Sequence, residues 1–263
     1  MAESSPLAGL LAGKKGLIVG VANKNSIAWA CARMLRDAGM ELAFTYQGEV
    51  MRDRVMKTVS DLGEVPLFDL DVTSDEQIQA LHEGIRGVWG EKLDFLLHSV
   101  AYAPSPAMNN PFLQTQRADF GTAMDISAYS LVALTRQFMP MLEGGGSVVT
   151  MSYYGSQKAV PGYNVMGVAK AALEACVRYL AVDAGPHGVR VNAVSAGAVN
   201  TLAARGVAHF RDLMKITAER SPMKRTIEPD EVGRATLFLA SDLSTGITGE
   251  TMYVDAGFNI TAG

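Results

Sequence analysis

Short apolar runs alternate along the chain with longer segments of helical periodicity. The segments between them, such as 27–39 and 167–185, carry apolar residues every three or four positions and end at a glycine, as a glycine-capped helix does. Strands that alternate with helices imply βαβ units and a parallel sheet. We therefore predict an α/β protein whose seven-stranded parallel sheet is flanked by helices on both faces. The runs predicted as strands are 16–20, 40–46, 64–72, 93–99, 146–152, 188–197 and 250–257.

The whole chain, 1–263, is predicted to form one domain, because no repeat, low-complexity tract or change in composition marks a linker. Segments 103–118 and 198–225 show no regular pattern and are expected to be loops over a site. In a doubly wound sheet of the Rossmann type, ligands bind beyond the carboxyl ends of the strands. Residues that follow the strands are therefore the first candidates for the site.

Composition narrows the class of protein. Apolar residues make up 48% of the chain, charged residues make up 19%, and there are 26 glycines, as in a globular protein with many tight turns. The net charge of -4 offers no basic surface for nucleic acid. The N-terminal residues do not resemble a secretory signal and no uncharged stretch is long enough to span a membrane, so we expect a cytoplasmic protein. Neither the two cysteines nor the four histidines have metal-ligand spacing, so no metal site is predicted.

The first predicted strand ends at Gly20, and a helix opens shortly afterwards. A glycine permits a sharp turn here, and the backbone N–H groups together with Ser26 could hold a pyrophosphate at the start of the helix. The three-glycine fingerprint of dinucleotide sites is incomplete, because Ser26 and Ala28 stand where later glycines would be. From these residues alone, a purely structural turn is an equal alternative.

The second and third strand ends carry candidates for the adenosine half of a dinucleotide. Gln47 can hydrogen-bond ribose hydroxyls but brings no positive charge to a 2′-phosphate, which favours NADH over NADPH. Arg52 and Arg54 lie close enough in sequence to keep NADPH open. Asp71 and Val72 could hold the adenine amino group, and a helix-capping role for Asp71 is an equal alternative.

Tyr163 and Lys170 are separated by seven residues in a predicted helix. This spacing returns the helix to nearly the same face about 10 Å along its axis. Helical side chains lean toward the N-terminus, so Lys170 is expected to reach back toward Tyr163. The ammonium could then hold ribose hydroxyls while the phenol donates to a substrate oxygen. Taken alone, such a pair is more often two unrelated surface residues.

Much of the chain resembles the short-chain dehydrogenase/reductase superfamily, and more closely its divergent branch, the bacterial enoyl-acyl-carrier-protein reductases of the FabI type. Ordinary members carry a tyrosine four residues before the lysine and a serine about thirteen residues earlier, where this chain has Met166 and Tyr153. The FabI branch instead places tyrosines where Tyr153 and Tyr163 stand, with the same Lys170. The stretches that carry the resemblance are 16–32, 98–104, 151–181, 189–206 and 249–260.

The resemblance implies an NADH-dependent reductase of the trans-2 double bond in enoyl thioesters, acting on acyl-carrier-protein-bound substrates in type II fatty acid biosynthesis as a homotetramer. It implies that Tyr163 hydrogen-bonds the thioester carbonyl oxygen and that Lys170 binds the nicotinamide ribose. Tyr153 would contribute to the pocket or to proton delivery, and Ala103 would line the acyl pocket. The cofactor contacts that it implies are Gly20, Ser26, Ile27, Gln47, Asp71, Val72, Val100, Lys170, Val199, Asn200, Thr201, Leu202 and Ala203.

Segment 198–225 resembles the substrate-binding lid of this family, although its apolar positions would also suit permanent packing on the core. Among the histidines, His98 at a strand end is the candidate for a supporting position behind the cofactor. Two other functions are open: a 3-oxoacyl or other carbonyl reductase, and a catalytically silent NAD-sensing protein. Met166 argues against the first, and the presence of both Tyr163 and Lys170 argues against the second.

Overall fold

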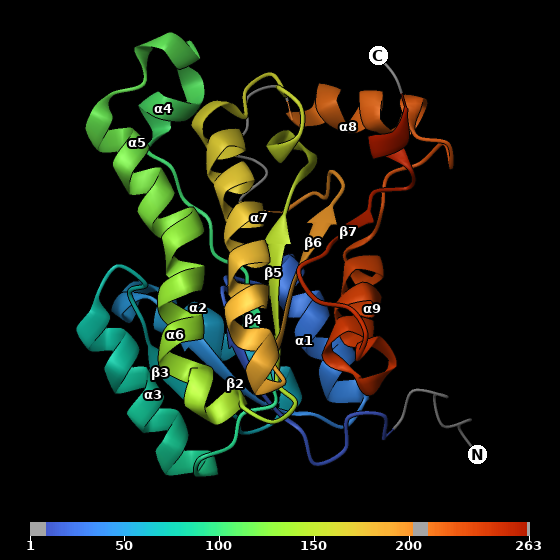
Figure 1. Ribbon diagram of the computed structural model, residues 1–263. Coiled ribbons are helices and arrows are strands. Elements are labelled where there is room, and N and C mark those ends of the chain that lie inside the picture. Colours follow the sequence, from blue (N-terminus) through green and yellow to red (C-terminus); the bar gives the residue numbers. More distant parts are fainter. Residues whose placement is uncertain (1–8, 202–209, 262–263) are drawn as a thin grey trace.

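The computed structural model describes residues 9–201 and 210–261 and contains a seven-stranded sheet with the order β3-β2-β1-β4-β5-β6-β7 (Figure 1). All neighbouring strands pair in parallel. The strand order reverses between β1 and β4, which is the switch point where doubly wound sheets bind ligands. The predicted fold class is confirmed, and each predicted run contains one strand. The strands are β1 Lys15–Val19, β2 Glu41–Tyr46, β3 Leu67–Asp69, β4 Phe95–His98, β5 Ser147–Ser152, β6 Arg190–Ala196 and β7 Thr251–Val254.

Helices cover both faces of the sheet, and two further helices lie at its carboxyl edge (Figure 1). On one face pack α1 Ile27–Asp37, α2 Gly48–Val59 and α9 Pro229–Ala240. On the other pack α3 Asp75–Trp89, α6 Ser130–Leu142 and α7 Asn164–Ala184. At the carboxyl edge lie α4 Ser105–Asn109 and α8 Phe210–Arg220, and α5 Arg117–Met124 leads into α6. Within the described ranges, no helix has the length and apolarity needed to cross a bilayer.

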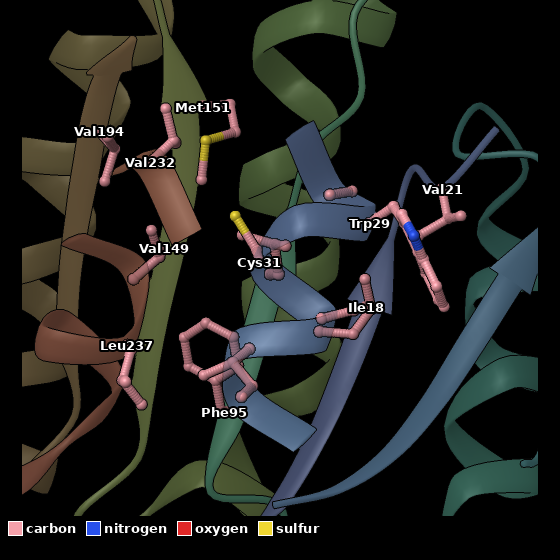
Figure 2. Packing of buried hydrophobic residues seen from close by; sticks show 14 of the residues in the cluster. Ile18, Val21, Trp29, Cys31, Phe95, Val149, Met151, Val194, Val232 and Leu237 are labelled. Atoms are coloured by element: carbon pink, nitrogen blue, oxygen red, sulfur yellow. The ribbon is translucent and has the colours of Figure 1, made fainter. Parts of the chain in front are cut away.

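The pleat of the strands divides the core into two layers. Ile18 of β1 belongs to the cluster under α1 and α9, whereas its neighbours Leu17 and Val19 belong to the cluster under α3, α6 and α7. Figure 2 shows the first cluster, in which Trp29 and Leu237 approach the sheet from α1 and α9. Because both faces are covered, the strands are apolar at successive positions instead of alternating.

The glycines predicted to end two helices have different backbone conformations. Gly39, just after α1, has φ +100° and is the left-handed cap that the sequence predicts. The helix α7 also ends at the predicted glycine, because Gly185 is its C-cap residue, but Gly185 has φ −56° and continues into a 3₁₀ turn, Gly185–His187. The left-handed residue is Gly188, with φ +76°.

The two segments expected to be irregular contain short helices. Segment 103–118 includes α4, a 3₁₀ turn at Phe112–Gln114 and the start of α5. Segment 198–225 includes α8. The expectation of loops is therefore wrong in part. A helix of five residues such as α4, bounded by Pro104 and closely followed by Pro111, is too short to show a helical period in the sequence.

Candidate active site

A cavity of about 920 Å³ opens at the carboxyl edge of the sheet. Its wall is formed by residues that follow β1, β2, β3, β4, β5 and β6, as the fold class predicts. This volume lies in the range of sites for cofactors and small ligands. The predicted site residues that line it are Gly20, Ile27, Gln47, Asp71, Val72, Val100, Ala103, Tyr153, Tyr163, Lys170, Val199 and Thr201.

The turn after β1 lies very close to the backbone that follows β4. Gly20 has φ +111°, and a Cβ built there would lie 2.1 Å from the carbonyl oxygen of Ser99. A side chain at this position would therefore push the turn away from the residues after β4. The Ser26 hydroxyl accepts hydrogen bonds from the N–H groups of Ala22 (3.1 Å) and Asn23 (3.0 Å), so it shapes the turn that leads into α1. The alternative of a structural turn is thus confirmed, whereas the pyrophosphate site stays a prediction, with Gly20 and Ile27 in the wall of the cavity.

Polar side chains meet at the end of β2 and β3. The Gln47 amide nitrogen donates to Oδ2 of Asp71 over 3.1 Å, and both residues line the cavity. Asp71 also accepts from the backbone N–H and the hydroxyl of Thr73, and these bonds lower the pKa of its carboxyl group. The alternative of a helix cap formed with Thr73 and Ser74 is confirmed in part: Ser74 caps α3, and Asp71 holds the turn before it through Thr73. A carboxylate beside Gln47 disfavours a 2′-phosphate at this end of the cavity.

The two arginines that kept NADPH open lie on α2. The Arg52 guanidinium lies 3.5 Å from a carboxylate oxygen of Glu49, and Arg54 is exposed. The Lys24 ammonium, from the turn before α1, lies 2.6 Å from Asp61. Arg52 and Lys24 thus have acidic partners of their own.

Tyr163 and Lys170 line the same cavity. They were expected to lie on one face of a helix, but only Lys170 lies within the helix. Tyr163 is the residue before α7, and Asn164 follows it with φ +39°. The Lys170 ammonium donates to the carbonyl oxygen of Met151 over 2.7 Å. Lys170 is therefore held by β5, and Tyr163 is placed by the turn before the helix.

The two phenols lie edge to face, with the ring centroids of Tyr153 and Tyr163 separated by 4.8 Å at an interplanar angle of 67°. Burial raises the pKa of Tyr153 to about 12. Burial, with a smaller contribution from Tyr153, raises the pKa of Tyr163 further. Both side chains are therefore neutral hydrogen-bond donors at pH 7.

Burial also lowers the pKa of Lys170 to about 8, and the carboxylate of Glu174 opposes this shift. The side chain is still mostly an ammonium ion at pH 7. A buried cation next to two phenols at the end of a strand can bind hydroxyl groups and stabilise negative charge that develops nearby.

His98 is buried behind this wall. Its Nε2 lies 2.7 Å from the hydroxyl of Ser130, and its Nδ1 lies 2.8 Å from the hydroxyl of Thr150. Because the Ser130 hydroxyl donates to the carbonyl oxygen of Ile126, it accepts from Nε2–H, and Nδ1 accepts from Thr150. Burial, and then the charge of Lys170, lowers the pKa of His98 to about 3, so it is a neutral support between β4, β5 and α6.

The other end of the cavity is mostly apolar, and the sequence did not indicate all of its wall. Ala103 lines it as expected, together with Tyr102 and Ile126. The Ser127 hydroxyl accepts from the N–H of Tyr102 and donates to its carbonyl oxygen, both over 2.9 Å. Ile126 and Ser127 lie in a π-helical turn, Asp125–Tyr129, a type of turn that is frequent at functional sites and that has no apolar period to reveal it.

The predicted lid is described in part. Val199, Thr201 and, from α8, Leu213 line the cavity, whereas Asn200 lines a neighbouring cavity of about 460 Å³. Leu202 and Ala203 lie outside the described residues.

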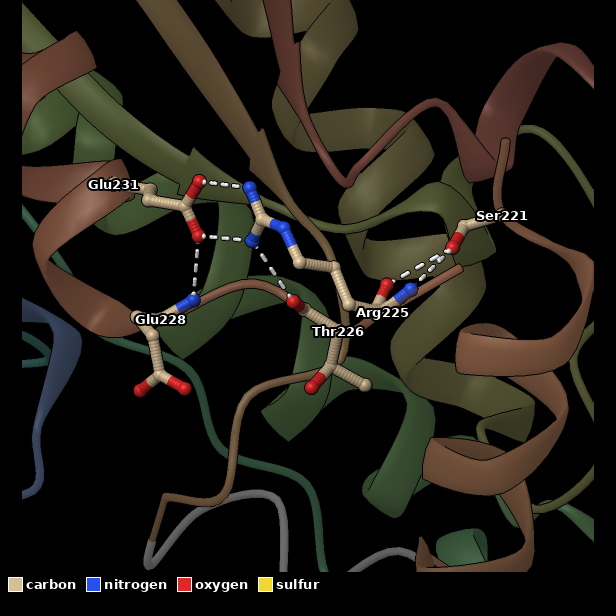
Figure 3. A network of polar contacts seen from close by, with 5 residues as sticks. All are labelled: Ser221, Arg225, Thr226, Glu228 and Glu231. Atoms are coloured by element: carbon tan, nitrogen blue, oxygen red, sulfur yellow. Dashed lines mark hydrogen bonds and ion pairs between the residues drawn. The ribbon is translucent and has the colours of Figure 1, made fainter. Parts of the chain in front are cut away.

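The chain between α8 and α9 is held by a polar network (Figure 3). The Arg225 guanidinium donates to both carboxylate oxygens of Glu231, over 2.7 and 2.8 Å. The N–H of Glu228 donates to the same carboxylate over 2.9 Å, and the Ser221 hydroxyl donates to the carbonyl oxygen of Arg225. The end of segment 198–225 is thus anchored to the start of α9.

A doubly wound parallel sheet with a glycine turn at its first strand, and with a half-buried tyrosine and a buried lysine at the cavity, defines the short-chain dehydrogenase/reductase class. Within this class, residues 20–259 match the protein family described as Enoyl-(Acyl carrier protein) reductase. The chain belongs to this family.

Relatives agree in sequence and in structure. The chain is 46% identical over 259 residues to enoyl-acyl-carrier-protein reductase (NADH) 1 of Rhizobium meliloti, covering 98% of this chain and 94% of that protein. The crystal structure of enoyl-acyl-carrier-protein reductase (NADH) from Aquifex aeolicus superposes with a TM-score of 0.94 at 46% identity, covering 97% and 100% of the two chains. The crystal structure of an enoyl-acyl-carrier-protein reductase from Anaplasma phagocytophilum, in complex with NAD, gives a TM-score of 0.94 at 42% identity and 97% coverage of each chain.

Proposed function

We propose that this protein reduces the trans-2 double bond of enoyl thioesters bound to acyl carrier protein, with NADH as the reductant, as a step of type II fatty acid biosynthesis. The observation that carries the proposal is that Tyr153, Tyr163 and the buried Lys170 line one cavity, with the two phenol rings edge to face. Membership of the enoyl reductase family supports it.

The residues present fit a nicotinamide dinucleotide. Gly20 leaves room where a Cβ would meet Ser99, and α1 begins beside this turn, so that its N–H groups can hold a pyrophosphate. When bound, the cofactor supplies a hydride ion to C3 of the enoyl thioester. The proposed contacts are Gly20, Ser26, Ile27, Gln47, Asp71, Val72, Val100, Lys170 and the stretch Val199, Asn200, Thr201, Leu202 and Ala203.

We infer that Tyr163 donates a hydrogen bond to the thioester carbonyl oxygen, where negative charge develops as the enolate forms. Its raised pKa keeps the phenol protonated, which a donor requires. Lys170, fixed to the carbonyl oxygen of Met151, would hold the ribose hydroxyls and support this charge. Tyr153 would complete the pocket or deliver a proton toward C2, and Ala103 would contact the acyl chain.

The preference for NADH over NADPH follows from the adenosine end of the cavity. Gln47 and the carboxylate of Asp71 suit ribose hydroxyl groups, whereas a 2′-phosphate would meet a like charge. The acidic partners of Lys24 and Arg52 support this preference.

The proposal extends to the assembly, the compartment and the lid. A single reductase domain would assemble as a homotetramer, for which exposed apolar side chains such as Tyr179 and Val182 on α7 offer contact surface. The two cysteines are free thiols, as is usual in the reducing cytoplasm. Segment 198–225, with Leu213 at the cavity, would close over the acyl chain and exclude water.

Substrate comparison tests the proposal. Oxidation of NADH or NADPH is followed by absorbance after addition of a trans-2-enoyl thioester or, as a control, a 3-oxoacyl thioester. We expect rapid oxidation of NADH with the enoyl substrate alone. Activity restricted to the 3-oxoacyl compound would make the protein a carbonyl reductase, and NADH binding without turnover of either would make it an NAD sensor.

A further inference from the structure

A buried carboxylate lies one helical turn beyond Lys170. Glu174 on α7 is only 2% exposed, and its position places it on the same side of the helix as Lys170. A carboxylate is costly to bury unless hydrogen-bond donors surround it. The partners of Glu174 therefore show what its burial achieves.

Three side-chain donors converge on this carboxylate. The hydroxyls of Ser152 (2.5 Å) and Ser156 (2.6 Å) donate to Oε1, and the amide of Gln157 (2.8 Å) donates to Oε2. One donor precedes Tyr153 in the chain, and the other two follow it. The turn formed by residues 152–157 is thus wrapped around a single side chain of α7.

This turn sets the positions of both phenol rings. It contains Tyr153, whose carbonyl oxygen accepts from the N–H of Ser156 over 2.9 Å. It also contains Gly155, where an added Cβ would lie 2.4 Å from Cδ1 of Tyr163. The backbone of the turn therefore packs directly on the Tyr163 ring, and a shift of the turn would displace both tyrosines.

Glu174 also acts on the lysine. Its negative charge favours the ammonium form of Lys170 and so raises the pKa of that group against the effect of burial. Lys170 and Glu174 attach α7 to consecutive residues of β5, through the carbonyl oxygen of Met151 and the hydroxyl of Ser152. Glu174 therefore contacts the turn that positions Tyr153 and Tyr163 and the strand that holds Lys170.

We propose that Glu174 is a positioning residue, which holds the turn 152–157 so that Tyr153 and Tyr163 keep their edge-to-face arrangement beside Lys170. The effect of Glu174 on catalysis rests on the proposed function. The contacts of Glu174 exist in the protein without substrate. Its effects on structure and on cofactor binding can therefore be measured separately from turnover.

The test compares Glu174→Gln with Asp183→Asn, which removes one negative charge from the exposed end of the same helix. We expect Glu174→Gln to lower kcat for the enoyl thioester by about 10- to 100-fold, because small displacements of reacting groups have effects of this size. The KM for NADH at pH 6.5 should change by less than about threefold, because Lys170 stays protonated there. Asp183→Asn should behave as the wild-type protein.

The pH dependence of NADH binding is measured by fluorescence. A purely structural role of Glu174 would leave this pH dependence unchanged. Lys170 interacts electrostatically with His98 of β4 and with Glu174 on its own helix, and Tyr153 and Tyr163 line the same cavity. Burial, and then the charge of Glu174, raises the pKa of Tyr253 on β7, which does not line the cavity. The pKa of His98 lies far below the range from pH 7 to 10, and the pKa values of Tyr153 and Tyr163 lie above it, so the loss of NADH binding there reports Lys170. In Glu174→Gln this loss should begin at lower pH than in Asp183→Asn.

Ser156→Ala removes one donor and keeps the carboxylate. We expect it to lower kcat and to leave the pH at which NADH binding is lost unchanged. If Glu174→Gln does not fold, Ser156→Ala still tests whether the contacts of Glu174 position the catalytic groups. A wild-type kcat in Ser156→Ala, or a Glu174→Gln protein with wild-type kcat and an unshifted loss of binding, would overturn the inference. If the wild-type protein reduces no enoyl thioester, the proposed function fails, and the shift in NADH binding still tests Glu174.

Discussion

At the scale of single residues, the site depends on phenols that remain protonated. Burial raises the pKa of both Tyr153 and Tyr163, so neither is a base at neutral pH. In our account Tyr163 donates a hydrogen bond to developing negative charge and Tyr153 completes the pocket or delivers a proton, while Lys170 of α7, held by the carbonyl oxygen of Met151, adds a positive charge. This arrangement suits an enolate better than the transfer of a proton to a phenolate.

Tyr163→Phe tests the role of the phenol directly. Loss of one donor at a developing oxyanion lowers kcat by about 100- to 1,000-fold in comparable sites. We expect a decrease in this range in steady-state assays, with little change in NADH affinity, because the phenyl ring still fills its place beside Gly155. Tyr129→Phe, on an exposed side chain that does not line the cavity, is the matched control. Equal kcat values for the two variants would show that Tyr163 does not act on the substrate oxygen.

Asn164 combines an unusual backbone with contacts to the substrate end of the cavity. It has φ +39°, and its amide nitrogen donates to the carbonyl oxygens of Met108 (2.8 Å) and Asn110 (2.9 Å). Asn164→Gly and Asn164→Ala both lose these bonds, but only glycine adopts this backbone without strain. Urea unfolding should show Asn164→Ala to be less stable than Asn164→Gly by about 1 kcal/mol. The KM for the enoyl thioester should rise in both variants, and an alanine variant as stable as the glycine variant would exclude the strain.

At the scale of elements, the sequence predicts the strands well because most of them are buried apolar runs bounded by turn residues; the half-buried strands β3 and β7 lie at the two edges of the sheet. Gly20, Gln47 and Asp71 lie in the cavity wall, because strand ends meet at one edge of a parallel sheet, and their contacts with the cofactor stay a prediction. The position of Tyr163 before α7 was not predicted, because helical spacing does not reveal where a helix begins. Glu174 was missed for a related reason: on a helix it resembles any charged position, and only the fold brings Ser152 and Gln157 to it.

Gly20→Ala tests the close approach of the turns after β1 and β4. An alanine here combines φ +111° with a Cβ that would lie 2.1 Å from the carbonyl oxygen of Ser99. We expect the free energy of unfolding to fall by about 2 kcal/mol and NADH affinity, measured by fluorescence titration, to fall at least tenfold. Gly87→Ala is the control, since nothing lies within 4 Å of a Cβ added to this position in α3. It should be neutral or slightly stabilising, and similar NADH affinity in both variants would argue against the turn as part of the cofactor site.

At the scale of the whole molecule, the titration of Lys170 makes stability and NADH affinity depend on pH in opposite directions. Its pKa is about 8 in the folded protein and about 10.5 ordinarily, so between these values the unfolded chain binds more protons than the folded one. The stability of the cofactor-free protein should therefore rise with pH across this window, relative to Lys170→Met. NADH affinity should fall over the same window, because the ammonium that holds the ribose is lost.

Urea unfolding and fluorescence titration from pH 7.5 to 10.5 measure both effects on the same samples. Lys170→Met removes the titrating group, so it should lack both the rise in stability with pH and the fall in NADH affinity that the wild-type protein shows. A cofactor affinity that stays constant while the stability difference develops would separate Lys170 from the cofactor site.

Hydride transfer itself tests the central claim most directly. NADH labelled with deuterium at C4 of the nicotinamide is given to the wild-type protein with a trans-2-enoyl thioester, and the product is examined by mass spectrometry and NMR. The account predicts a saturated thioester with deuterium at C3 and a solvent-derived hydrogen at C2. An intact double bond, or deuterium on a carbon that carried an oxygen, would contradict it.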